Sequence, residues 1–545
     1  MSELTQYHIQ RWGNLKSKRG NFENQWEEAA SLVIPAHRDS FTSRGMNNAF
    51  GAEGQKKTEK QFDSTAAMAC QRFSAIIESL ATPQASLWHR ISPSDKTLKR
   101  NRAARVFFDD LNERLYDFRY RPSANFVGNS QQVYVALGAY GNGSLFVDQP
   151  EEGKGLRYRY AHLGEVWYAE NHAGVIDTFY WARWLEARQI VQEYQRGGDN
   201  IPEAITEAMK NPNTVGKKFE VLQCVYPRRD YDPQRVDAKG MPFASLTILV
   251  QTQDLIRESG YNSFPLPTSR YSQAPGEVYG RGPAQWVLPA IKVANEEKKT
   301  LLQQGHRALN PVLLGHDDGV VGTFSLKPGA LNPGTMTKDG KRLVDILPSG
   351  NVALGEELLE MEKNDIKDAF LIPLFQILVD TPQMTATEVL ERAREKGLLI
   401  APTAGRIQAE FLGRLIEREI DLLAQQGLLP PLPSILQGED IQYQIDYDSP
   451  MARMAKAERS AGFVRSVMQT AELVKLTQDP SLLDHYNFDM ATPAVADLQG
   501  VPIDWMNSQD VVEQKRAARA EQAQTQQMVE AAPAMASVAS TMAKQ

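Results

Sequence analysis

Hydrophobic residues recur at helical spacing from the start of the sequence to Tyr140. Apolar or aromatic side chains at intervals of three and four residues predict helices, expected at residues 3–34, 62–81, 101–119 and 125–137. Pro35 ends the first stretch and Pro83 the second, because proline lacks the amide hydrogen that a helix interior requires. Residues 36–57 are polar and contain several glycines, so they predict a loop.

The pattern changes to short strand-like runs after Tyr140. Asn142-Gly143, followed by Leu145-Phe146-Val147, is a residue pair that strongly favours a two-residue hairpin turn. Further strands are expected at residues 156–161, 165–169, 175–184, 218–228 and 243–252, with one or two helices over 185–211. The part of the chain before Tyr271 therefore predicts an α+β unit with a meandering antiparallel sheet.

Two long helices flank a glycine-rich insert in the middle of the chain. The first is expected from Pro289, which suits a first helical turn, to Asn310, a length of roughly 30 Å. The second is expected over residues 353–372. Residues 311–350 between them are rich in glycine and proline. Short strands are expected within this insert, at 320–326 and 342–347. The order predicts an insert that caps one end of a helical pair.

The remainder of the chain is predicted to be mainly helical. After a short loop, Thr385 can cap a helix, and Glu388 stands at the capping-box spacing. Ala401-Pro402-Thr403 interrupts the helical pattern that follows. The elements expected are helices at 386–397, 404–426 and 452–476, a strand at 441–447, and shorter helical pieces over 481–506. The C-terminal segment after these pieces predicts a solvated helix or a disordered tail.

Composition limits the classes of function. The formal net charge is -7, from 60 Lys and Arg against 67 Asp and Glu. A protein that grips DNA phosphates over a wide area needs clustered cations, so this balance argues against such a grip but permits DNA to slide past. Cys70 and Cys224 stand far apart, which excludes a disulfide framework and a cysteine-based zinc site. With no signal-peptide pattern and no long apolar run, we expect assembly in the cytosol and no membrane.

The common catalytic patterns are missing from the sequence. The stretch from Gly334 to Lys341 has one residue too many for a phosphate-binding loop, and Arg342 stands where Ser or Thr is needed. Gly280-Arg281-Gly282 is better explained as a tight turn, and His316-Asp317-Asp318 as a polar turn than as a metal site. Neither HExxH nor GxSxG occurs. The sequence therefore predicts no enzyme, cofactor or metal.

Ordered blocks of residues carry a resemblance to a known family. They are Phe62-Asp63-Ser64-Thr65-Ala66, Leu80-Ala81-Thr82-Pro83, Trp88, Tyr279-Gly280-Arg281-Gly282-Pro283, Leu288-Pro289, Ala294-Asn295-Glu296, Leu309-Asn310-Pro311-Val312-Leu313-Leu314, Thr385-Ala386-Thr387-Glu388-Val389, Pro402, Glu410, Arg414, Leu415, Arg418 and Ser449-Pro450-Met451-Ala452-Arg453. In order and spacing they resemble the head-to-tail connector, or portal, proteins of T7-like and related podoviruses. The resemblance covers about residues 5 to 500, without the 36–57 loop and the C-terminal tail.

The resemblance implies a portal-protein fold, α+β and mainly helical, assembled as a closed twelve-subunit ring at one capsid vertex. The implied regions are a wing at 1–280, a first stem helix at 281–310, a clip at 311–350, a second stem helix at 351–377, a tunnel loop at 378–384, the long helix and strand of the wing at 385–450, a crown at 451–505, and a C-terminal helical or disordered tail at 506–545. Double-stranded DNA would be packaged and ejected through the ring. The implied protein partners are further copies of the chain, the terminase motor, tail adaptor or nozzle proteins, and the major capsid and scaffolding proteins.

Two short segments are the candidate functional sites. In the expected tunnel loop, Asp380, Thr381, Pro382 and Gln383 include no cation, a composition that favours sliding of DNA over holding it. In the expected clip, the cations are Lys327, Lys338, Lys341 and Arg342. We expect some of these cations to face DNA or the acidic surface of a docked partner.

Two other classes of protein compete with this interpretation. An internal core or scaffold protein of the virion would be more uniformly helical and would not need a glycine-rich insert between two helices. A packaging ATPase or nuclease is disfavoured by the missing phosphate-binding loop. A ring-shaped particle with a central hole would distinguish a portal protein from both.

Overall fold

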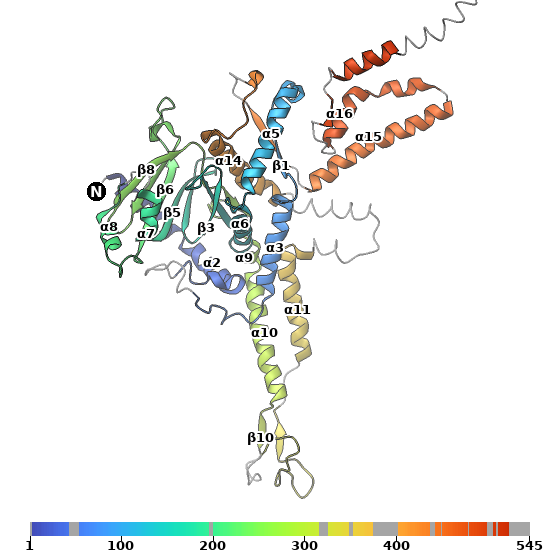
Figure 1. The fold of residues 1–545 in the computed structure, drawn as a ribbon. Helices are drawn as coiled ribbons and strands as arrows, with labels where there is room; N and C mark the ends of the chain where they lie inside the picture. The colour runs from blue at the N-terminus through green and yellow to red at the C-terminus, as the bar shows by residue number, and fades with distance from the viewer. Residues whose placement is uncertain are drawn as a thin grey trace, which may run out of the picture. The chain divides into compact units, whose positions relative to one another are not determined.

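The computed structural model describes residues 3–42, 54–195, 200–315, 325–347, 352–373, 402–436, 442–447, 450–477, 479–498, 505–507 and 511–522 (Figure 1). The chain divides into two compact units. The first comprises Met1–Ser86 and Leu115–Leu429, and the second comprises Leu87–Arg114 and Pro430–Gln545. Helix and sheet are mixed, as the α+β prediction required. Among the described residues, no helix combines the length and the apolar character that crossing a membrane requires.

Two antiparallel sheets form the centre of the first unit. The larger sheet has the order β4-β5-β6-β7-β8 and the smaller one β3-β2-β9. Their strands are β2 (Asn142–Asp148), β3 (Arg157–Ala161), β4 (Val166–Glu170), β5 (Ile176–Glu186), β6 (Lys218–Pro227), β7 (Phe243–Leu249), β8 (Asp254–Tyr261) and β9 (Thr268–Arg270). The predicted meander is confirmed for β3 to β7. The sequence analysis missed β8 and β9.

Helices cover both faces of the larger sheet, because side chains alternate between faces along each strand. On one face, Leu222 packs in a cluster with Trp12 of α1 (Glu3–Lys18). On the other face, its neighbour Val221 packs with Ile190 and Ile205. These two residues belong to α7 (Ala187–Tyr194) and α8 (Glu203–Lys210). A layer of helix on each side thus buries the sheet.

The predicted helix over 3–34 is two helices, α1 and α2 (Gly20–Val33), which meet at Arg19. The buried Arg19 guanidinium donates to the carbonyls of Leu163, at 3.1 Å, and Val166, at 2.5 Å. It also lies 4.2 Å from the centre of the Trp167 ring. Arg19 therefore anchors the junction of the two helices to β4, which explains the break. A short 3-10 turn, η1 (Pro35–His37), follows α2.

The expected hairpin turn at Asn142-Gly143 is wrong. Gly141, with φ of 72°, ends helix α6 (Phe126–Tyr140), and Asn142 is already the first residue of β2. Asn142 binds distant backbone: its Nδ2 donates to the Gly280 carbonyl at 2.9 Å, and its Oδ1 accepts from the Gly280 amide at 2.8 Å. A Cβ on Gly143 would lie 2.5 Å from the Val133 carbonyl oxygen. The Asn-Gly pair therefore serves close packing between α6, β2 and the segment around Gly280.

The remaining elements of the first unit are mostly helical. They are α3 (Thr65–Ala81), η3 (Ala238–Gly240), α9 (Pro283–Trp286), α10 (Leu288–Leu309), β10 (Leu313–Gly315), β11 (Val344–Ile346), α11 (Val352–Ala369), η4 (Ile407–Leu412) and α14 (Gly413–Gln425). The predicted face of the helix at 404–426 is confirmed at Ile407, Phe411, Leu415, Ile416 and Leu423, all of which are buried. η4 is a π-helical turn within this helix.

The second unit pairs segments from distant parts of the chain. β1 (His89–Pro93), which the sequence analysis missed, is antiparallel to β12 (Tyr443–Tyr447). Asn112 supports β1, since its Oδ1 accepts from the Ile91 amide at 2.8 Å and its Nδ2 donates to the Ile91 carbonyl at 3.1 Å. The other elements are α4 (Lys96–Arg100), the start of α5 (Arg102–Arg119), η5 (Ser434–Leu436), α15 (Pro450–Thr477), η6 (Pro480–His485) and α16 (Phe488–Leu498). Residues 511–522 are also helical, which fits the helical alternative for the tail.

Candidate functional site

The two predicted sites differ in what the structure says of them. Asp380, Thr381, Pro382 and Gln383 lie outside the described residues. Lys327, Lys338, Lys341 and Arg342 are described, and they lie in the segment that connects α10 to α11. In Figure 1, α10 and α11 run side by side, with β10 and its loops at their end. The helix, insert, helix order predicted from the sequence is therefore confirmed.

α10 joins the rest of the first unit through Asn295. This buried side chain accepts hydrogen bonds from the amides of Phe62, at 2.7 Å, and Asp63, at 3.2 Å. Its Nδ2 donates to the Lys60 carbonyl at 3.0 Å. Ser64 then precedes α3. Two sequence blocks from distant parts of the chain, Phe62-Asp63-Ser64 and Ala294-Asn295-Glu296, thus meet at one amide side chain.

α11 packs on α10 and α3. Gly355 lies against Leu301 of α10, so closely that a Cβ would come within 2.7 Å of the leucine Cδ2 atom. Directly after α11, Phe370 makes an edge-on contact with Phe73 of α3, at 6.0 Å between ring centres. Leu359 and Ile366 are buried on the same side of α11. The helical pair is therefore attached firmly at the end remote from the insert.

A strand pair opens and closes the insert. β10 and β11 are antiparallel, with Leu314 opposite Asp345, and the Leu347 amide donates to the Val312 carbonyl at 2.9 Å. The predicted strand at 342–347 is thus found as β11. Its partner is β10 at 313–315 and not the expected 320–326, of which residues 320–324 lie outside the described part. Proximity to α10 explains this choice, because the residues that directly follow one helix meet those that directly precede the next.

Three of the four candidate cations lie at one tight turn. The Thr337 amide donates to the Lys341 carbonyl at 2.8 Å, and the Lys341 amide donates to Thr337 Oγ1 at 3.0 Å. Gly340, with φ of 81°, allows this reversal, since positive φ costs glycine little. Lys338, Lys341 and Arg342 all have exposed side chains there.

The electrostatic character of the insert is positive. Residues 325–347 contain four cations against Asp339 and Asp345. Lys327 is exposed like the other three, and within the described residues no carboxylate lies within ion-pair distance of any of the four. None of the described residues of 311–347 is buried. The insert thus presents unneutralised cations on a segment that has little core of its own.

The residues that follow the tunnel-loop segment hold α14 to both sheets. Arg270 of β9 donates to both oxygens of Glu410, at 2.9 and 3.0 Å, and it also pairs with Glu170. Arg414 donates to the Ile176 carbonyl at 2.5 Å. The buried Arg418 pairs with Asp421 at 3.0 Å. Glu410, Arg414 and Arg418, known from the sequence only as a recognition block, are therefore packing residues. The sequence analysis missed their partner Arg270, because nothing local marks it.

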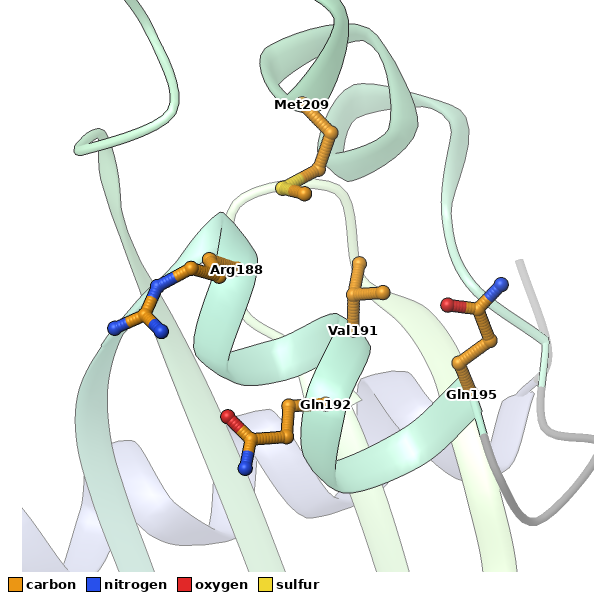
Figure 2. A pocket seen from close by; sticks show the side chains of 5 residues that line it. All are labelled: Arg188, Val191, Gln192, Gln195 and Met209. Carbon is orange, nitrogen blue, oxygen red and sulfur yellow. The ribbon is translucent and has the colours of Figure 1, made fainter.

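A shallow hollow of about 410 Å³ lies between α7 and α8. Its lining is Arg188, Val191, Gln192, Gln195 and Met209, and Figure 2 shows Val191 and Met209 on facing sides of it. These side chains include no carboxylate, imidazole or thiol, so they offer neither a general acid or base nor a nucleophile. Within the described part of the chain, no group of three His, Cys, Asp or Glu residues could hold a metal ion.

Comparison with known proteins identifies the class to which this architecture belongs. The family model described as "Bacteriophage head to tail connecting protein" matches residues 5–506, and the chain belongs to this family. The chain is similar to the "Portal protein" of Salmonella phage epsilon15, with 26% identity over 98% of this chain and 95% of the relative. It is also similar to the "Probable portal protein" of Bordetella phage BPP-1, with 26% identity over 97% of this chain and 93% of the relative.

Proposed function

We propose that this protein is a phage portal subunit. Copies of it form a ring at one capsid vertex, double-stranded DNA is packaged and ejected through the ring, and the packaging motor and then the tail attach to it. The match to the head-to-tail connecting family over residues 5–506 is the observation that carries this proposal. The similarity to two phage portal proteins over nearly their full length supports it. The role is structural and needs no catalytic site.

The proposed division of labour follows the elements. The sheets and surrounding helices of residues 1–280 form the wing, together with the helix and strand of 385–450. α10 and α11 are the stem, and the insert 311–350 is the clip. Residues 378–384 are the tunnel loop, and 451–505 form the crown. An elongated helical pair with a small, positively charged insert at its end supports the stem and clip assignment.

The clip is proposed as the docking point for the terminase motor and then for tail adaptor proteins. Its cations Lys327, Lys338, Lys341 and Arg342 would pair with acidic side chains of these partners or with phosphates of the passing DNA. The tunnel loop residues Asp380, Thr381, Pro382 and Gln383 would contact DNA without a cation. DNA could therefore move past them without being held.

Particle images of the purified protein test the proposal. A closed ring, with twelve copies as the expected number and a central hole wide enough for duplex DNA, is the result we expect. Solid or rod-like particles would favour an internal core or scaffold protein instead. ATP hydrolysis or DNA cleavage by the pure protein would contradict a purely structural role.

A further inference from the structure

Helix α11 has apolar side chains on two sides. Leu359 and Ile366 are buried toward its own chain. On another side, Leu358 is 47% exposed and Met361 is 63% exposed, and the exposed Leu354 extends this line by one turn. Spacings of three and four residues place these three side chains on one face of the helix. We call Leu354, Leu358 and Met361 the α11 stripe.

The chain's own helices occupy the other side of α11. Leu301 of α10 lies against Gly355, and Phe73 of α3 lies against Phe370. A helix that is apolar on opposite sides is typical of an element buried in an assembly. The α11 stripe therefore has the character of a contact surface.

Acidic residues surround the stripe. Glu357, Asp365 and Asp368 are exposed and follow it at helical spacing. The two lysines of α11 lie elsewhere: Lys363 is largely covered and bonds to Glu360 at 2.9 Å. Two copies of the stripe in contact with each other would bring like charges together, which disfavours a self-complementary dimer. The stripe fits a surface that is apolar and basic.

Helix α10 offers such a surface. It carries four cations, Lys292, Lys298, Lys299 and Arg307, against two glutamates, whereas α11 carries six acids against two lysines. Its side chain Leu302 is 45% exposed, and Val293 is also exposed. The two helices are thus opposite in net charge, and each has exposed apolar side chains.

The two surfaces lie at the same level along the helical pair. Leu301 is opposite Gly355. One turn away, Lys363 and then Lys298 hold the pKa of Glu360 below its ordinary value. Leu302 is therefore level with the stripe. In a closed ring, neighbouring copies are related by rotation without a shift along the axis, so surfaces at equal height can meet.

We propose that the α11 stripe of one copy packs against α10 of the next copy, around Leu302. Each copy supplies two different surfaces, so the contact is head-to-tail and can close into a ring. This inference rests on the proposed portal function and names the faces by which the ring assembles.

Two single variants and their mixture test the contact. Leu358→Glu removes the stripe and Leu302→Glu removes its counterpart, each by placing an unpaired charge in an apolar contact. We expect each variant alone to remain monomeric, with association weakened on the order of 100-fold. Val236→Glu, which puts the same charge at a fully exposed valine far along the chain, is the matched control and should form rings.

The mixture has a distinctive outcome. Leu358→Glu chains keep an intact α10 and Leu302→Glu chains keep an intact stripe, so one contact can form between them and no further copy can join. Mass photometry or native mass spectrometry should therefore find heterodimers and no rings. Circular dichroism spectra identical to wild type would show that both variants fold.

Two other results have separate meanings. Normal rings from either variant, or a mixture without heterodimers, would overturn the α11–α10 contact while leaving the portal function intact. If the wild-type protein forms no ring at any concentration, the proposed function fails first.

Discussion

The Arg119 guanidinium and the Glu419 carboxylate form an ion pair with both side chains fully buried. Arg119 Nε donates to Glu419 Oε1 at 3.0 Å, and the Tyr158 hydroxyl donates to the same oxygen at 2.7 Å. Burial alone would lower the pKa of Arg119, but the Glu419 carboxylate raises it above its ordinary value. The pair joins the end of α5 to α14, two helices from distant parts of the chain.

Glu419→Gln should destabilise the protein strongly. The substitution leaves the buried Arg119 without a counter-charge, which costs about 3–5 kcal/mol of unfolding free energy. Urea denaturation of the monomer measures this loss. The double variant Arg119→Leu with Glu419→Leu should recover part of it, since no charge is then buried. The exposed pair Arg235–Asp237 supplies a control: Arg235→Ala should leave the denaturation midpoint unchanged.

Gly282→Ala should destabilise the fold through backbone crowding. A Cβ at Gly282 would lie 2.6 Å from the Gly141 amide nitrogen and 2.7 Å from the Leu137 carbonyl oxygen, and backbone atoms cannot move aside cheaply. We expect a loss of about 2–3 kcal/mol. Gly305→Ala is the matched control, because nothing lies within 4 Å of a Cβ there and alanine favours the interior of α10 by about 1 kcal/mol. Opposite shifts in melting temperature would confirm both statements, and a neutral Gly282→Ala would contradict the first.

His37 should make the stability of the first unit depend on pH. Burial, and then the charge of Lys57, lower the pKa of His37 from 6.5 to about 4. The unfolded state therefore binds the proton more readily than the folded state between pH 4 and 6.5, so stability is complete above pH 6.5 and is lost as the pH falls toward 4.

His37→Gln should flatten this dependence. The glutamine can keep a hydrogen bond to the Tyr140 hydroxyl, which lies 3.2 Å from His37 Nδ1, but it does not titrate. Relative to wild type, the variant should lose up to about 3 kcal/mol less stability between pH 6.5 and 4. Denaturation curves at several pH values measure the difference, and parallel pH profiles for the two proteins would refute it. His8, whose pKa burial also lowers to about 4, is unchanged in both proteins and cancels.

Charge reversal in the insert should impair DNA packaging or tail attachment. Lys338→Glu, Lys341→Glu and Arg342→Glu together replace three exposed cations at the Thr337–Lys341 turn by acids. Contacts to acidic partners or phosphates would then become repulsive. Counting filled heads and tailed particles in a phage that carries the triple variant measures the effect.

A control variant separates this effect from a change in net charge. Lys210→Glu, Lys217→Glu and Arg229→Glu make the same change at exposed positions outside the insert. This control should package DNA and attach tails normally. Normal yields from the insert variant as well would contradict the proposed role of these cations.

Several elements were predictable from local pattern, because their signals lie close together in the chain. Proline in the first turn and continuous helical spacing locate α10, and the apolar face of the helix at 404–426 is largely buried as predicted. The same local rules fail for β1 and β9. β9 is very short, and β1 pairs with β12 from a distant part of the chain, so neither shows a pattern of its own. Asn142-Gly143 misleads for a related reason: the Asn142 side chain binds Gly280, which no local rule anticipates.

By itself, the sequence determined the class of the protein. Its ordered blocks, its lack of catalytic patterns, and the two helices around a glycine-rich insert all follow from residues that are close together in the chain. Only the tertiary structure decided what those blocks do. Asn295 ties α10 to the segment before α3, and Arg270 ties β9 to Glu410, because folding brings distant polar groups together where each must find a partner. The α11 stripe likewise became visible only once the other side of that helix was seen to be covered.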